Sequence, residues 1–572
     1  MQLTTSPDIG APETRFLPAG FDPSDPEAVA AQVERLLERP IDGPSALEAW
    51  ILDRGELGSI VGAGLARRYI AMTCDTKDDS AKESYLSYQK NVIAPFRDLD
   101  NRLNEKFLSC PHLDALPERY ALYVKRKRKE KDLYREENTP LHTKDSELSA
   151  KYAEIQGAVT VEFRGETLTA QQVGAKLEET DRDLREDAWR SLASRRQQDA
   201  PKISDLFDEM VALRTKIARN AGFDDYRDYR FEEFQRFDYG PEDCFAFHDA
   251  VEKHVVPAVL EIAEWRKNEL GLPSLRPWDF AVDPTGRPPL RPFGDQGKYI
   301  RLVRRLFHAV DPGFEDQFDV LVRNGLLDLM SRRGKAPGGY QYQLEDIRLP
   351  FIFINAVGTH GDIQTLLHEG GHSFHSMACR NEELSDYRHP PIEFAEVASM
   401  GMEMLGIERF GEIYDEEEAR NAQRQHLTRV ISVFAWVATV DAFQHWVYTH
   451  PEHSREERAR EWLRIRDRFA PHIDWTGLEE FRPDEWQRQG HIFGHAFYYI
   501  EYAIAQIGAL QVWRNEKRDH GQAVTAYRKA LALGGSRPLP ELFETAGLRF
   551  AMDDSVLGEL IPMVMKSFRA LI

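Results

Sequence analysis

Two histidines four residues apart, with a glutamate directly after the first, are the residues whose types and spacing point most directly to chemistry in this sequence of 572 residues. They are His368, Glu369 and His372, in the stretch GDIQTLLHEGGHSFHS. Residues four apart on a helix lie on one face, so both imidazoles can bind the same metal ion. A glutamate next to the first histidine can hold the water bound to that ion, as in zinc hydrolases. The pattern predicts a zinc site with Glu369 as the general base.

Two consecutive glycines, Gly370 and Gly371, stand between the histidines. Each costs about 1 kcal/mol relative to alanine inside a helix. That loss makes sense if another backbone or a substrate strand must approach the helix closely. The glycines therefore favour a built site over an ordinary helix with two surface histidines.

A third ligand is expected downstream, because catalytic zinc usually takes three protein ligands and leaves one position open. The candidates are His375, Glu382, Glu383, His389, Glu393, Glu396 and Glu403. The segment IEFAEVASMGMEMLGI is apolar nearly all round and predicts a buried helix, in which a carboxylate needs a strong partner such as a dication. We predict Glu396 as the third ligand and Glu403, on the same face, as an acceptor that orients an imidazole. The two glutamates could also exchange these roles.

Most of the remaining sequence has apolar residues at three-four spacing, which predicts helices. Two regions favour extended chain instead. Alternation over residues 158–170 predicts a small hairpin that turns at Arg164 and Gly165, and the aromatic and β-branched residues of 338–358 predict strands that lead into the metal-binding helix.

Composition excludes several classes of function. The 95 acidic residues outnumber the 74 Lys and Arg, for a formal charge of -21, so nucleic acid and membranes are poor candidates as partners. No apolar stretch approaches the roughly 18 to 20 residues of a membrane span, and the start lacks the pattern of a secretory signal. The four cysteines form no CxxC pair. We expect a soluble, cytoplasmic protein.

The motif HEGGHSFHS, followed by the glutamate of FAEVASMGMEML, resembles the zinc metallopeptidases of the thimet oligopeptidase and oligoendopeptidase F family. The stretches KIARNAGFDDYRDYRF, GKAPGGYQY, HIFGHAFYYIEYAIAQIGALQVW and LALGGSRPLPELFETAGL are similar to the oligoendopeptidase F branch. They predict a catalytic region over residues 200–572, preceded by an N-terminal helical lobe over residues 1–199 that includes the hairpin. The resemblance implies a mainly α fold, a large helical ellipsoid with a deep substrate channel and a small β-sheet or hairpin near the active site.

The resemblance also implies the ligands and the substrate-binding groups. One zinc ion per chain would be bound by His368, His372 and Glu396. The family uses a histidine and tyrosines from a late helix to hold the substrate carbonyl and stabilise the oxyanion. The corresponding residues here are His491, Tyr498 or Tyr499, and Tyr502, with a shorter loop leaving the choice between Tyr498 and Tyr499 open.

The implied activity is hydrolysis of internal bonds in short unstructured peptides. The turn of Gly338, Gly339 and Tyr340 would pair with extended substrate backbone. A carboxydipeptidase of the same family, a helical scaffold and a non-catalytic, zinc-containing peptide-binding protein are the alternatives. The last would need a fourth protein ligand, for which His375 and His389 are the candidates.

Overall fold

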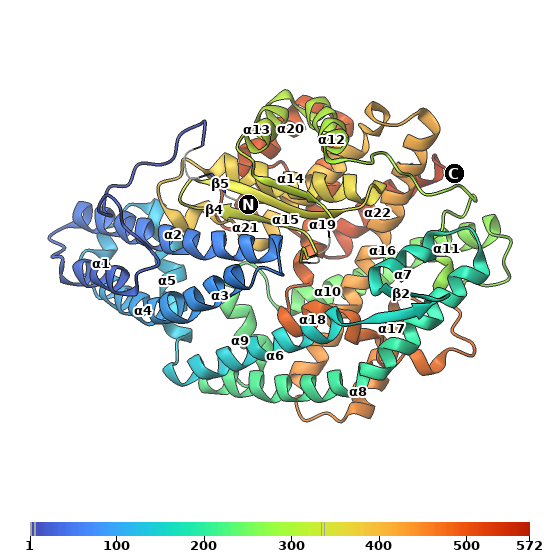
Figure 1. Cartoon of the computed structure of the whole chain (residues 1–572), viewed down its shortest axis with the longest axis horizontal. Coiled ribbons are helices and arrows are strands. Elements are labelled where there is room, and N and C mark those ends of the chain that lie inside the picture. Colours follow the sequence, from blue (N-terminus) through green and yellow to red (C-terminus); the bar gives the residue numbers. More distant parts are fainter. Residues whose placement is uncertain (1–2, 5–6, 333, 337) are drawn as a thin grey trace. The chain divides into compact units, whose positions relative to one another are not determined.

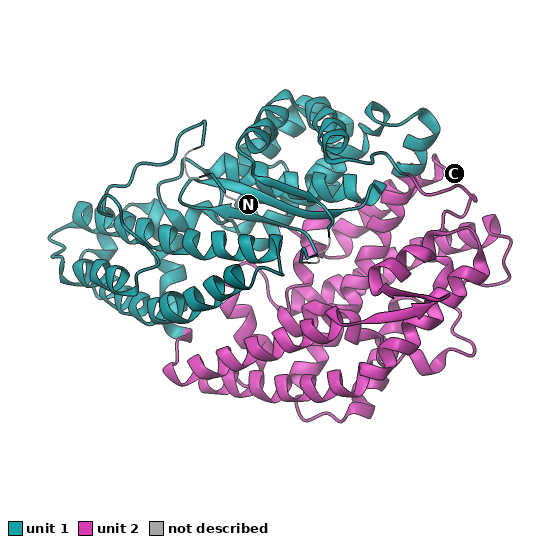
Figure 2. Cartoon of the chain, in the orientation of Figure 1, with its two compact units in different colours: residues 1–132, 291–422, 508–550 teal, residues 133–290, 423–507, 551–572 magenta. Residues whose placement is uncertain are grey.

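The fold is mainly helical, and the residues that the structure describes form two small sheets (Figure 1). The computed structural model describes residues 3–4, 7–332, 334–336 and 338–572. The chain forms two compact units, each assembled from three segments of the sequence (Figure 2). Unit 1 comprises residues 1–132, 291–422 and 508–550, and unit 2 comprises residues 133–290, 423–507 and 551–572. The prediction of a mainly α fold with small β elements is confirmed.

The two units are a different division from the predicted boundary between residues 199 and 200. Compact units group segments by proximity in space, whereas the predicted boundary separates stretches by the motifs that they carry. The predicted N-terminal lobe and catalytic region therefore stay a prediction about sequence content.

The helices of each unit come from both early and late parts of the chain. Those wholly or mostly in unit 1 are α1 (Pro26–Glu38), α2 (Pro44–Cys74), α3 (Asp79–Tyr88), α4 (Ala94–Leu108), α5 (Ala121–Leu133), α12 (Gln296–Val310), α13 (Pro312–Arg323), α14 (His360–Cys379), α15 (Ile392–Ile407), α19 (Ile500–Arg518), α20 (His520–Leu531) and α21 (Leu539–Thr545). Those wholly or mostly in unit 2 are α6 (Thr139–Gly157), α7 (Ala170–Ala175), α8 (Arg182–Asn220), α9 (Tyr226–Glu233), α10 (Pro241–Ala250), α11 (Val256–Glu269), α16 (Glu416–Thr449), α17 (Arg455–Phe469), α18 (Gly490–Gly494) and α22 (Asp554–Arg569).

The first helices of unit 1 form because capping and apolar spacing agree. Asp25 accepts hydrogen bonds from the first backbone N–H groups of α1. Val33 and Leu36 then fall on the buried face of α1, and they belong to one apolar cluster with Trp50 of α2 and Phe107 of α4. This cluster is the core of the N-terminal part of unit 1.

A three-stranded sheet in unit 1 leads into the metal-binding helix. The strand order is β3 (Leu327–Met330), β5 (Leu349–Ala356), β4 (Tyr340–Leu344), with β3 parallel and β4 antiparallel to β5. The central strand β5 is almost entirely buried, as its apolar run LPFIFINA favours. β4 and β5 confirm the strands predicted within 338–358.

The link from β5 to α14 is held by the first turn of the helix. Thr359 is the N-cap of α14, and its hydroxyl and the Asp362 carboxylate form a capping box. One carboxylate oxygen of Asp362 also accepts hydrogen bonds from the backbone N–H groups of Val357 and Gly358. The start of α14 is therefore fixed to the end of the sheet.

The small sheet of unit 2 is the predicted hairpin, formed by β1 (Thr160–Phe163) and β2 (Glu166–Thr169). Its two-residue turn places Arg164 at φ 50° and Gly165 at φ 87°. Two consecutive positive φ values match the twist of a tight hairpin. Val161 packs with its neighbours against α8, in the second apolar cluster.

Among the described residues, helix α16 alone has the length and the apolar composition that a membrane-spanning helix needs. The sequence analysis did not identify α16 as a candidate membrane span, because polar residues interrupt its apolar stretch. Of its most apolar window, 72% is buried inside the structure. The core of the protein thus covers most of this apolar surface.

Candidate active site and metal centre

Helix α14 packs against its neighbours α12 and α15 at the two glycines of the metal-binding motif. A Cβ atom on Gly371 would lie 2.4 Å from the carbonyl oxygen of Ala398 on α15, and one on Gly370 would lie 2.4 Å from the ring of Phe307 on α12. Neither position tolerates a side chain without movement of a neighbour. The predicted close approach of another backbone is therefore that of α15, the helix that carries Glu396.

The structure brings His368, His372 and Glu396 together, with one ligand atom from each within 4.8 Å of the others. Oε2 of Glu396 lies 3.4 Å from Nε2 of His368 and 3.6 Å from Nε2 of His372. Two ligand atoms bound tetrahedrally to one zinc ion are separated by about 3.3 Å, since each lies about 2.0–2.1 Å from the metal. The three side chains therefore fit a zinc ion.

Glu403 occupies a different position from Glu396. Its Oε1 accepts a hydrogen bond of 2.7 Å from Nδ1 of His368, the ring nitrogen away from Glu396. Oε2 of Glu396 in turn accepts a hydrogen bond of 2.9 Å from the hydroxyl of Ser399. This arrangement is that of a ligand and an orienting carboxylate, and it favours the first assignment of the two glutamates over their exchange.

The protonation of the two histidines follows from this arrangement. Burial lowers the pKa of His372 to about 4, so its imidazole is neutral and free to bind a cation through Nε2. Burial also opposes the charged form of His368, but hydrogen bonds to Glu396 and Glu403 outweigh it and hold the pKa of His368 well above its usual range. Burial raises the pKa of Glu396, but the two histidines lower it by more, and the resulting pKa is about 2. The site thus contains an ionised carboxylate prepared for a cation.

Glu369 is buried beside these groups but belongs to a different face of α14. Burial, aided by the negative charges of Glu396 and Glu403, raises its pKa to about 7, and a hydrogen bond from the backbone of Gln341 on β4 opposes the shift. A carboxyl group with a pKa near neutrality can both accept and release a proton at that pH. The environment of Glu369 suits a general base.

Neither candidate fourth ligand joins the group around His368 among the described residues. His375 is buried, with no hydrogen-bond partner for either ring nitrogen, and it packs against the ring of Phe394. Nε2 of His389 lies 3.2 Å from Glu345 and its side chain is 60% exposed. The three-ligand set leaves a coordination position for water or substrate.

The predicted Gly-rich turn precedes β4 at the edge of the sheet. Gly338 has φ 95°, and a Cβ on Gly339 would lie 3.3 Å from the carbonyl oxygen of Phe353. The ring of Tyr340 stacks on Phe353 at 4.7 Å, and its hydroxyl forms a 2.6 Å hydrogen bond with Thr73 of α2. Tyr340 is thus a structural anchor of β4, and the two glycines are the exposed part of the turn.

The residues predicted to hold the substrate carbonyl cluster within unit 2. The ring of His491 on α18 lies 5.1 Å from that of Tyr499, 5.7 Å from Tyr498 and 5.8 Å from Tyr502. Nδ1 of His491 is hydrogen-bonded to the side chain of Gln489 at 2.8 Å. All three tyrosines face the histidine, so the choice between Tyr498 and Tyr499 stays open.

Comparison with known proteins identifies the family of this chain. A model of peptidase family M3 matches residues 175–560, more than half of the chain. The chain belongs to peptidase family M3. This confirms the resemblance that the sequence motifs indicated, and M3 peptidases are zinc metallopeptidases.

Relatives of this M3 peptidase include oligoendopeptidase F homologs. The homolog of Borreliella burgdorferi is 28% identical over 243 residues, 40% of each chain, and that of Mycoplasma pneumoniae is 22% identical over 453 residues, 72% of this chain and 70% of the relative. The first of these matches spans less than half of the relative's length. Among solved structures, PZ peptidase A with an inhibitor has a TM-score of 0.89 at 28% identity, covering 96% of this chain and 99% of its own.

Several residues that support the site of this M3 peptidase were not predicted. Ser399 holds Glu396, Phe307 packs on Gly370, and the hydroxyl of Tyr527 on α20 donates a hydrogen bond to the carbonyl of Ala398. Ser399 was within reach of sequence reasoning, because it follows Glu396 by three residues on the same helix. Phe307 and Tyr527 are distant in sequence and no local pattern marks them.

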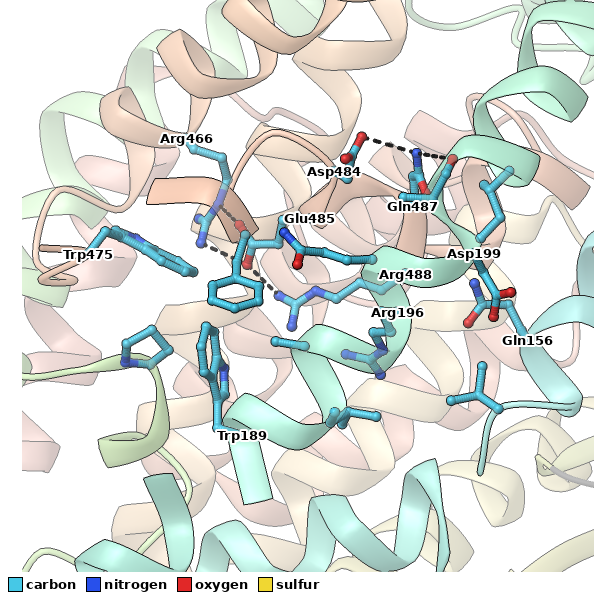
Figure 3. A pocket seen from close by; sticks show the side chains of 18 of the residues that line it. Gln156, Trp189, Arg196, Asp199, Arg466, Trp475, Asp484, Glu485, Gln487 and Arg488 are labelled. Carbon is cyan, nitrogen blue, oxygen red and sulfur yellow. Dashed lines mark hydrogen bonds and ion pairs between the residues drawn. The ribbon is translucent and has the colours of Figure 1, made fainter. Parts of the chain in front are cut away.

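A separate cavity of about 300 Å³ lies within unit 2 and holds none of the predicted site residues (Figure 3). Trp189 and Trp475 form one part of its wall. Glu485, also on the wall, pairs with Arg466 at 2.8 Å and with Arg488 at 3.0 Å. These three charges are paired with one another, and the wall also includes Arg196, whose Nε is buried without a hydrogen-bond partner.

Proposed function

We propose that this M3 peptidase is a zinc-dependent oligoendopeptidase that hydrolyses internal bonds of short unstructured peptides. The observation that carries the proposal is the position of Glu369, buried on α14 between two histidines that face one carboxylate of α15. Three protein ligands and an adjacent base are what hydrolysis by a zinc enzyme requires. The names of the relatives, oligoendopeptidase F homologs, support the same activity.

The proton transfers belong to Glu369. When bound, zinc would acidify a water molecule and polarise the peptide carbonyl. Glu369 accepts a proton from the attacking water and then delivers it to the leaving amine, and its raised pKa suits both transfers near neutral pH. Glu403 keeps the imidazole of His368 in the orientation that presents Nε2 to the ligand group.

Substrate binding is proposed to use extended backbone. β4 pairs with β5 on one side and is an edge strand of the described sheet, so its other side can pair with a peptide. Gly338 and Gly339 at the start of β4 allow close approach of that backbone. We further propose that His491 and the tyrosines donate hydrogen bonds to the substrate carbonyl; burial raises the pKa of Tyr499, which keeps its phenol protonated as a donor.

We also propose the binding partners and the cellular compartment of this peptidase. The partners are short peptides, without nucleic acid or membrane. None of the four cysteines forms a disulfide, which supports the reducing cytoplasm as the compartment.

The substitution Glu369→Gln tests the proposal. It removes the base and preserves the shape of the side chain, so the variant should keep its zinc and lose about 10²- to 10⁴-fold in turnover of a quenched decapeptide. Glu412→Gln is the matched control, because that side chain is half-exposed and pairs with Arg305 at 3.7 Å. Undiminished turnover by Glu369→Gln with zinc retained would refute the role of the base.

Substrate length is a second test. A substrate that must pair as extended backbone has to be unfolded, so peptides under about 20 residues should be cut much faster per bond than folded proteins. Mass spectrometry of timed digests measures both rates. Equal rates per bond would remove the preference for short peptides from the proposal.

A further inference from the structure

A second group of metal-binding side chains lies in the core of unit 2. Cys244 of α10 and Asp441 and His445 of α16 place one ligand atom each within 4.8 Å of one another. A fourth residue, His248, follows Cys244 by four positions on α10, as His445 follows Asp441 on α16. Each helix therefore presents two potential ligands on one face, with the spacing used by the histidines of the catalytic motif.

The contacts inside this group leave ligand atoms available. Nε2 of His248 is hydrogen-bonded to Oδ2 of Asp441 at 2.8 Å. Nε2 of His445 lies 3.3 Å from the same oxygen, the separation of two ligands on a tetrahedral zinc ion, but without the geometry of a hydrogen bond. Both ring nitrogens of His445 and Oδ1 of Asp441 are buried without a hydrogen-bond partner.

Burial makes these free atoms costly. Cys244 and Asp441 are 0% exposed, and His248 and His445 are 3% exposed. Among the described residues, Asp441 forms ion pairs with the two histidines, while the positive charges of Arg236 and Arg227 partly oppose the effect of burial on the pKa of the neighbouring Cys244 thiol. A buried carboxylate needs a cation or a hydrogen-bond donor for each of its oxygens, and Oδ1 of Asp441 has no hydrogen-bond partner. A dication bound to Asp441, His445 and Cys244 would neutralise the carboxylate and would give one ring nitrogen of His445 a partner.

The shell around the group is aromatic. The ring of His445 lies 4.9 Å from Phe245, 5.4 Å from Phe497 and 5.9 Å from Phe231, and the ring of His248 lies 6.3 Å from Phe469. These rings exclude water and strengthen binding of an ion by the polar groups inside them, and the guanidinium of Arg236 packs on the outer member Phe231 at 4.5 Å.

We propose that unit 2 contains a second metal site, in which Cys244, Asp441 and His445 bind a zinc ion and His248 supports the Asp441 ligand through its hydrogen bond. A thiolate, an imidazole and a carboxylate are ligands that zinc accepts together, whereas magnesium and calcium select oxygen alone. The ion links α10 to α16. This proposal goes beyond the proposed hydrolysis and does not depend on it.

The site would also support the segment that carries His491. Gln444, the neighbour of His445, accepts a hydrogen bond of 2.9 Å from the backbone N–H of Phe497. Phe497 packs on His445 and has φ 65°, a strained value for a residue other than glycine. A metal that fixes α16 would therefore hold the backbone that leads into Tyr498 and Tyr499.

Cobalt substitution gives the test a spectroscopic signature. The catalytic group contains no sulfur, so a thiolate-to-cobalt charge-transfer band in the ultraviolet can come only from a site with a cysteine ligand. We expect this band in the full-length protein loaded with Co²⁺, its loss in Cys244→Ser and in His445→Gln, and its retention in Glu396→Gln. Cys110→Ser, which changes a buried cysteine of unit 1, is the matched control and should keep the band.

Zinc content supplies the second measurement. After equilibration with Zn²⁺ and gel filtration, the protein should hold about two ions per chain, and either Cys244→Ser or Glu396→Gln should lower this to about one. Because the cobalt band is read on the unmodified protein, a variant that fails to fold does not prevent the test. About one zinc ion per chain that is lost in Glu396→Gln, together with no thiolate band, would overturn the proposal.

Discussion

The substitution Gly371→Ala tests whether contact between α14 and α15 assembles the metal centre. The new Cβ would lie 2.4 Å from the carbonyl oxygen of Ala398 and 2.6 Å from Cα of Ser399, both backbone atoms. Cβ atoms essentially never come closer than 3.0 Å to another heavy atom, so the helices must separate by at least 0.6 Å. Glu396 is on the helix that moves, and both histidines are on the other.

The expected losses follow from that separation. Overpacking of this kind costs about 1–3 kcal/mol of stability. Metal–ligand distances tolerate about 0.2 Å of displacement, so the zinc affinity should fall by at least about tenfold. Urea unfolding measures the first loss, and competition with a chromophoric chelator measures the second.

Gly361→Ala is the matched control, because it makes the same change in the same helix. A Cβ there has its nearest neighbour at 3.5 Å, an ordinary contact. We expect it to keep the zinc affinity and to stabilise the protein slightly, since alanine is favoured over glycine in a helix. If Gly371→Ala binds zinc and unfolds as the parent protein does, the argument that helix contact assembles the site is wrong.

Two further predictions concern carboxylates. Glu403→Ala removes the 2.7 Å hydrogen bond to His368 and should weaken zinc binding by about 10- to 100-fold. Glu403→Gln keeps a hydrogen-bond acceptor and should lose less zinc affinity. If chelator competition gives both variants the zinc affinity of the parent protein, Glu403 does not orient His368. Burial raises the pKa of Glu516 to about 7 despite its 2.8 Å ion pair with Arg409, so the folded protein retains a proton that the unfolded chain releases near pH 4.5. Stability from this group is therefore present at low pH and lost as pH rises from about 4.5 to 7, and Glu516→Gln should be the more stable protein at about pH 8 but not at about pH 5 in urea unfolding. A less stable Glu516→Gln at the higher pH would show that the ion pair outweighs the cost of burial.

Local pattern was sufficient for much of the site. The spacing of His368 and His372 places them on one face of any helix, and the apolar surroundings of Glu396 marked a carboxylate in need of a cation. The glycine pair indicated a close approach before the partner was known. The turn at Arg164 and Gly165 and the strands within 338–358 were likewise predicted from residue types whose backbone preferences act over a few positions.

Contacts between distant segments were beyond the sequence. Nothing local identifies Ala398 and Phe307 as the neighbours of the two glycines, or separates the roles of Glu396 and Glu403, because these depend on how α12, α14 and α15 pack. The absence of a CxxC pair gave no reason to expect a cysteine in a metal-binding group, yet Cys244 lies against Asp441 and His445, almost 200 residues later in the chain.

What the sequence determined by itself is therefore the chemistry available along each helix, since helical periodicity is a property of the local chain. Which helix faces which, and so which free ligands meet in a buried space, was decided only by tertiary packing. Burial makes these contacts energetically important, because a polar group that is removed from water must find its partner on another segment.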